Sequence, residues 1–129
     1  MSKPIHQEVV IKASAKRIYE ALTDSKKFSE LTGGAPADIS KEAGGAFSMF
    51  GGMISGRNIE VLADQRLVQA WRAGNWSDGI YSVARFELKA QGADTLLIFD
   101  QAGFPPENRD DLEKGWSKMY WEPIKKYLG

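Results

Sequence analysis

The chain has 129 residues, of which 43% are hydrophobic and 26% charged, as is typical of one globular domain spanning residues 1–129. Its 17 basic and 17 acidic residues balance, so no overall field favours nucleic acid or an anionic membrane as a partner. The absence of cysteine excludes disulfide bonds, thiolate nucleophiles and cysteine-ligated metals.

The beginning of the chain predicts one strand followed by two short helices. Residues 5–12 are rich in β-branched side chains and partly alternate, as a strand does. Ser14 offers an N-cap oxygen, and the apolar residues after it recur at the spacing of one helix face. Asp24 or Ser25 can cap a second helix, and the glycine pair at 33–34 ends it.

In residues 37–102 the sequence pattern changes and predicts strands that are separated by turn residues. Five or six strands are expected, five of them at residues 46–50, 53–62, 66–72, 80–89 and 94–101. A spacing of about a dozen residues favours consecutive antiparallel hairpins, because parallel crossovers need a helix in each gap. In the fourth strand, alternation places five residues on the core face: Ile80, Ser82, Ala84, Phe86 and Leu88.

A last helix is predicted over residues 105–128. Acidic residues fill its first turns and lysines its end, which complements the helix dipole. Its apolar stripe includes Trp116, which we expect to be buried against Phe86 or its neighbours, and Pro123 is expected to kink the helix. The order of elements predicts an α+β fold in which a curved antiparallel sheet wraps around this long C-terminal helix.

The sequence offers little for metal or nucleophilic chemistry. His6 is the one histidine and is expected at the surface or a strand edge, whereas a histidine-ligated metal centre needs two or three. No metal, cofactor or catalytic residue is therefore assigned. The glycine-rich stretch 51–56 joins strand to strand and matches no phosphate-binding pattern, so we interpret its glycines as bends and bulges.

Charged residues on the predicted strands leave two placements open. They are Arg57, Glu60, Arg72 and Asp100. If they face inward they must pair, because a lone buried charge is costly, and they would anchor a ligand in an apolar cavity. If they face outward they form cross-strand ion pairs in water. The methionine and aromatic side chains likewise serve either core packing or a pocket.

An ordered series of motifs resembles the domains of the activators of heat-shock-protein-90 ATPase. The series consists of residues 51–56, Glu60-Val61, Trp71-Arg72, the turn at 76–79, Gly115-Trp116 and the aromatic–Glu-x-Ile-Lys pattern of residues 121–125. Two positions depart from the family pattern, because Ala63 and Ser77 stand where prolines are common. Neither departure touches obvious chemistry.

This resemblance implies the helix-grip fold of the START-like (SRPBCC) superfamily, with a cavity between the curved sheet and the long helix. The superfamily includes lipid carriers, polyketide cyclases and hormone receptors, so the fold does not fix an activity. The resemblance also implies that the ATPase is stimulated with the help of a separate N-terminal domain. We therefore expect this chain on its own not to stimulate the chaperone.

The first functional hypothesis is the binding of an apolar small molecule between the sheet and the C-terminal helix. The candidate lining residues are Phe47, Met49, Glu60, Trp71, Arg72, Tyr81, Phe86, Trp116, Met119 and Tyr120. The alternatives are a co-chaperone-type module whose partner is a chaperone, and a cyclase- or hydratase-like enzyme that uses Glu60, Asp100 or a tyrosine. No signal peptide or membrane span is visible, so a cytoplasmic, stress-related monomer or weak homodimer is expected.

Overall fold

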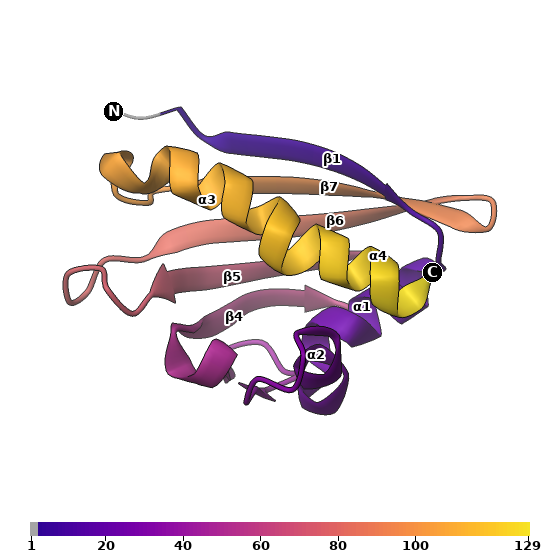
Figure 1. Cartoon of the computed structure of the whole chain (residues 1–129), viewed down its shortest axis with the longest axis horizontal. Helices are drawn as coiled ribbons and strands as arrows, with labels where there is room; N and C mark the ends of the chain where they lie inside the picture. Colours follow the sequence, from indigo (N-terminus) through magenta and orange to yellow (C-terminus); the bar gives the residue numbers. More distant parts are fainter. Residues whose placement is uncertain (1–2) are drawn as a thin grey trace.

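One antiparallel sheet of seven strands is the framework of the computed structural model, which describes residues 3–129 (Figure 1). The strand order is β1-β7-β6-β5-β4-β3-β2. The bounds are β1 Ile5–Ile11, β2 Asp38–Ile39, β3 Ala46–Met49, β4 Ile54–Leu62, β5 Arg66–Ala73, β6 Ser82–Gln91 and β7 Asp94–Ala102. Because β1 pairs with β7, the first strand of the chain lies beside the last.

Helices cover one face of this sheet. Two of them, α1 (Ala15–Thr23) and α2 (Ser25–Leu31), follow β1 directly. The C-terminal helix consists of α3 (Arg109–Trp116), a π-helical turn (Ser117–Trp121) and α4 (Glu122–Leu128). Figure 1 shows it crossing the sheet diagonally, with α1 and α2 near its C-terminal end. The predicted helix-grip fold is confirmed.

Side-chain caps set the beginnings of the two short helices, as the sequence predicts. Ser14 Oγ accepts a hydrogen bond from the backbone N–H of Arg17 at 3.3 Å. Asp24 Oδ1 accepts one from the backbone N–H of Lys27 at 2.9 Å, so Asp24 caps α2. Each cap satisfies a donor that the first helical turn leaves without an intrahelical partner.

A close backbone approach and a bulge shape the sheet beneath the helix. Gly56 on β4 faces the carbonyl of Ala70 on β5, and a side chain at this position would collide with that oxygen. The register of β4 against β5 shifts between Asn58 and Glu60, so Ile59 is an extra residue. Such a bulge bends the strand and increases its twist.

The irregularity expected at Pro123 takes the form of a π-helical turn just before it. The backbone N–H of Glu122 donates to the carbonyl of Ser117, five residues earlier. Proline has no N–H, and its ring crowds the carbonyl four residues before it. The wider turn makes room for that ring, and the helix continues as α4.

Two predicted strand boundaries are wrong. Phe50 lies in a short 3₁₀ turn, Phe50–Gly52, and has a positive φ of 54°. Ile80 precedes β6 and is 40% exposed. It still belongs to the turn before that strand, since its N–H donates to the Ser77 carbonyl at 3.1 Å. The two-residue strand β2 is a sixth strand after the short helices and lies outside the five ranges given from the sequence.

Aromatic rings fill the space between the sheet and the C-terminal helix. Trp116 lies at the centre, with its ring centroid 4.2 Å from that of Phe99 and 4.4 Å from that of Tyr120. The expected contact with Phe86 is confirmed, at 5.8 Å and an interplanar angle of 72°. Protein interiors are packed this densely as a rule, and here the packing closes the space between the centre of the sheet and the C-terminal helix.

Candidate ligand site at the edge of the helix grip

A pocket of about 240 Å³ remains where the C-terminal helix passes over the edge of the aromatic core. One wall comes from β4, β5 and the turn before β4, and the other from α3 and the π-helical turn. Its lining consists of Phe50, Met53, Ile54, Trp71, Ala73, Asp111, Leu112, Gly115, Trp116, Met119 and Tyr120.

Three aromatic side chains form the inner wall of this edge pocket. The ring centroids of Trp71 and Trp116 are 5.1 Å apart. Trp71 Nε1 donates to the Tyr120 hydroxyl at 3.4 Å, so these polar groups are directed at each other. Burial raises the pKa of Tyr120 despite this hydrogen bond, and the phenol stays protonated at neutral pH. The wall is thus apolar in character.

The rim of the edge pocket combines flexible apolar side chains with one carboxylate. Met53 is 70% exposed and Met119 is 44% exposed. Large apolar side chains at such exposure are adaptable contact surfaces for a ligand, and methionine is the most adaptable of them. Asp111, from the first turn of α3, supplies the carboxylate.

Four of the ten candidate residues named from the sequence line the edge pocket: Trp71, Trp116, Met119 and Tyr120. Phe47, Met49 and Phe86 lie in the closed core instead, each at most 3% exposed. Tyr120 connects the two regions, because its hydroxyl also approaches Met49 Sδ at 4.0 Å.

Glu60, Arg72 and Tyr81 do not line the edge pocket. The bulge at Ile59 reverses the alternation of β4, so Glu60 projects from the outer face and pairs with Arg66 at 3.2 Å. Arg72 follows the inward-facing Trp71 and therefore projects outward, where its guanidinium lies 5.8 Å from the Tyr81 ring centroid.

The open question about the charged residues is settled in favour of the outer face. Asp100 pairs there with Arg85 at 3.1 Å and with His6 at 2.7 Å. Arg57 is exposed and donates to the Gly44 carbonyl at 3.0 Å. The carboxylates considered for acid–base chemistry, Glu60 and Asp100, thus lie on the face of the sheet opposite the pocket.

Seven lining residues are absent from the list of candidates named from the sequence: Phe50, Met53, Ile54, Ala73, Asp111, Leu112 and Gly115. Helical spacing was a usable signal for three of them, because Leu112 lies four residues before Trp116, Gly115 four before Met119, and Asp111 four before Gly115. Phe50 and Met53 had no such signal, since their placement depends on a turn with positive φ.

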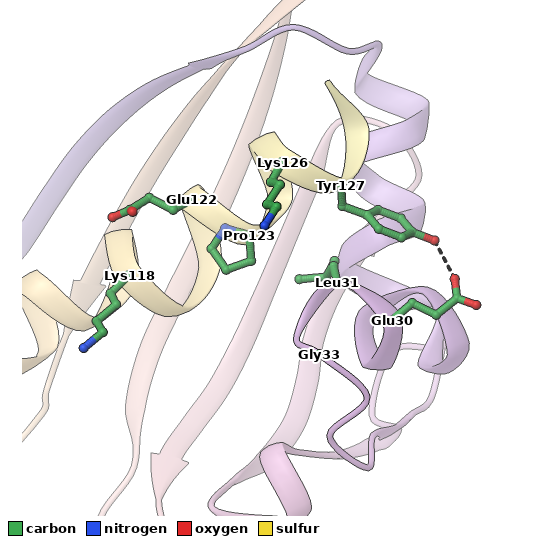
Figure 2. Close-up of a pocket in the computed structure, with 8 residues that line it drawn as sticks. All are labelled: Glu30, Leu31, Gly33, Lys118, Glu122, Pro123, Lys126 and Tyr127. Atoms are coloured by element: carbon green, nitrogen blue, oxygen red, sulfur yellow. Dashed lines mark hydrogen bonds between the residues drawn. The ribbon is translucent and has the colours of Figure 1, made fainter.

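A second hollow of about 670 Å³ lies between the end of α2 and α4 (Figure 2). The Tyr127 hydroxyl donates to the Glu30 carboxylate across it at 2.6 Å, and this bond raises the pKa of Tyr127. Lys118, Lys126, Glu30 and Glu122 all belong to the lining, so charges of both signs are present. These side chains are exposed, and the hollow selects no particular ligand charge.

Two further classes of site find no support in residues 3–129. No group of three or more His, Cys, Asp or Glu side chains in this range is arranged to hold a metal ion. Over the same range, no helix has the length and apolar character that crossing a bilayer demands.

Comparison with known proteins identifies the family of the chain. The family model described as "Activator of Hsp90 ATPase homolog 1-like protein" matches residues 12–129. The activator of 90 kDa heat shock protein ATPase homolog 2 of Mus musculus is 28% identical over 127 residues, which are 96% of this chain and 37% of that protein. The chain therefore spans about a third of the length of the curated relatives it matches.

Solved structures share the fold. An HSP90 activator from Plasmodium falciparum superposes with a TM-score of 0.91 at 22% identity, covering 98% of this chain and 96% of that one. The Aha1 dimer from Colwellia psychrerythraea gives a TM-score of 0.82 at 18% identity, again covering 98% and 96%. With the START-like helix-grip fold and the match over residues 12–129, the chain belongs to the family of activator of Hsp90 ATPase homolog 1-like proteins.

Proposed function

We propose that this domain is an accessory module that binds a small, mostly apolar molecule in the edge pocket. The observation that carries the proposal is the pocket wall of Trp71, Trp116 and Tyr120, next to a rim of exposed methionines. A concave apolar surface with few polar groups is the usual composition of a small-molecule site. The closed core supplies a rigid backing for it.

The volume of the edge pocket limits the size of the ligand. A cavity of about 150 Å³ accepts benzene, and pockets for drug-sized ligands begin near roughly 300 Å³. At about 240 Å³, the edge pocket suits a molecule of one or two rings. Long-chain lipids and polyketides exceed this space.

Gly115 supports the proposal because its presence in α3 has no packing reason. Glycine in a helix interior costs about 0.5–1 kcal/mol relative to alanine. An added Cβ at Gly115 would meet no atom within 4 Å, so no neighbour requires glycine here. Since Gly115 lines the edge pocket, its missing side chain keeps the wall open for a ligand.

The test uses a variant that fills the pocket. Gly115→Leu is expected to abolish binding of a two-ring probe such as naphthylethanol. Lys114→Leu, at the neighbouring exposed position outside the lining, is expected to retain it. Binding is measured by shifts of the Trp71 and Trp116 indole N–H signals in NMR and by a raised thermal midpoint. Equal binding by wild type and Gly115→Leu would place the ligand elsewhere and refute the proposal.

Family membership favours a second function, which is contact with an Hsp90-type chaperone. The relatives are named as activators of the 90 kDa heat shock protein ATPase, and the chain corresponds to about a third of their length. We propose that this 129-residue domain binds the chaperone without stimulating its ATPase. Sedimentation with purified Hsp90 should show a complex, and a coupled ATPase assay should show an unchanged rate. A dose-dependent rise in ATP hydrolysis would contradict the second half of this proposal.

A further inference from the structure

Asp111 is the one side chain in the lining of the edge pocket that is charged at neutral pH. It is exposed, and within residues 3–129 it forms no ion pair. The first turn of α3 also carries Asp110, so this end of the pocket is acidic. A carboxylate without a protein partner at the mouth of an apolar pocket is available to a cation of the ligand.

The inner wall of the edge pocket also favours a cation. Trp71, Trp116 and Tyr120 present aromatic rings, whose faces attract an ammonium group within about 6 Å. No lysine or arginine is among the lining residues, and Lys118 lines the other hollow instead. An anionic ligand would therefore meet the Asp111 carboxylate with no compensating positive charge.

We propose that the occupant of the edge pocket is a small protonated amine with an apolar body of one or two rings. The body lies against Trp116 and Trp71, and the ammonium group pairs with Asp111 at the rim. This inference rests on the proposed ligand-binding function and names the class of ligand. The one unpaired carboxylate gives the pocket selectivity between molecules of equal shape.

Three probes of equal ring size test the charge preference: naphthylethylamine, naphthylethanol and naphthylacetate. For the wild-type chain, calorimetric titration should show the amine binding about tenfold more tightly than the alcohol, as a partly exposed ion pair with a cation–π contribution predicts. The acetate should bind more weakly than the alcohol. Raising the ionic strength should reduce the difference between the amine and the alcohol, because salt screens exposed charges.

Two isosteric variants identify the carboxylate that is responsible. Asp111→Asn should bring the affinity for the amine down to that for the alcohol and leave the alcohol unchanged. Asp110→Asn, one residue away in the same helical turn but outside the lining, should keep most of the preference. Both variants remove one carboxylate from the first turn of α3, so a small and equal fall of their thermal midpoints shows that the fold is intact.

The outcomes separate this inference from the proposed function. Equal affinity of the wild type for amine and alcohol, or an unchanged preference in Asp111→Asn, overturns the amine assignment while binding in the pocket stands. Failure of all three probes to bind overturns both. Tightest binding of the acetate also overturns the amine assignment.

Discussion

The buried amide side chain of Gln101 holds Trp116 of the aromatic core in place. Gln101, 1% exposed, accepts a hydrogen bond from the Trp116 indole N–H at 2.7 Å. The amide of Gln101 donates to Ser82 Oγ at 3.0 Å, and this hydroxyl donates to the Trp71 carbonyl at 2.9 Å. The chain of bonds ties the Trp116 indole to the backbone of Trp71, because every buried polar group in it has a hydrogen-bond partner.

Gln101→Leu is expected to destabilise the fold by about 1–3 kcal/mol. Leucine has a suitable size, but it leaves the buried Trp116 N–H without an acceptor, and an unsatisfied buried donor costs about that much. Chemical denaturation of wild type and variant measures the change in the free energy of unfolding. In the Trp116→Phe background, where the N–H is absent, the same substitution should cost less. An equal cost in both backgrounds would show that this hydrogen bond does not contribute.

At the scale of elements, sequence patterns predicted what depends on local periodicity and local caps. Ser14 and Asp24 cap the short helices, and the stripe of the last helix places Trp116 on Phe86. Alternation along β5 and β6 is equally clear, since every second residue from Ser82 to Leu88 is buried. The caps, the apolar stripe of the helix and the alternation of the strands each arise within a single element and follow from its own residues.

The features that the sequence did not reveal arise from irregularities between elements. Strict alternation along β4 would place Glu60 on the inner face of the sheet. The extra residue Ile59 shifts the alternation, so Glu60 lies on the outer face. The turn at Phe50 removes that residue from its strand and brings it to the pocket. The pocket between the sheet and the C-terminal helix lies at one edge, because aromatic rings fill the centre, and such packing in three dimensions has no signature in sequence periodicity. Phe50 and Met53 were therefore out of reach of the sequence patterns.

Across the whole molecule, a ladder of charged side chains spans five strands on the outer face of the sheet. It runs from Glu8 to His6 at 2.8 Å, to Asp100 at 2.7 Å, to Arg85 at 3.1 Å, to Glu87 at 4.0 Å, to Arg66 at 3.6 Å and to Glu60 at 3.2 Å. Exposed ion pairs of this kind contribute little one by one. Their regular alternation of sign nevertheless couples β1 to the centre of the sheet.

The His6 end of this ladder predicts a pH dependence of stability. Hydrogen bonds to Asp100 and then to Glu8 raise the pKa of His6 above 6.5. A raised folded-state pKa means that the stabilisation is fully present below pH 6.5 and is lost as the pH rises through the folded-state value. The difference in unfolding free energy between wild type and His6→Gln should therefore be present in mildly acidic buffer and vanish in alkaline buffer. A difference that grows with pH would contradict this assignment.

The same sheet ends in two unequal edges, and this inequality bears on how the protein resists aggregation. β2 has two residues and offers a neighbouring molecule almost no backbone to pair with. β1 has seven residues and is the edge along which another strand has room to add. His6 and Glu8 point outward from β1 and are solvated. Charged side chains on an edge strand discourage such pairing, so the solubility of this chain depends on a few residues of its first strand.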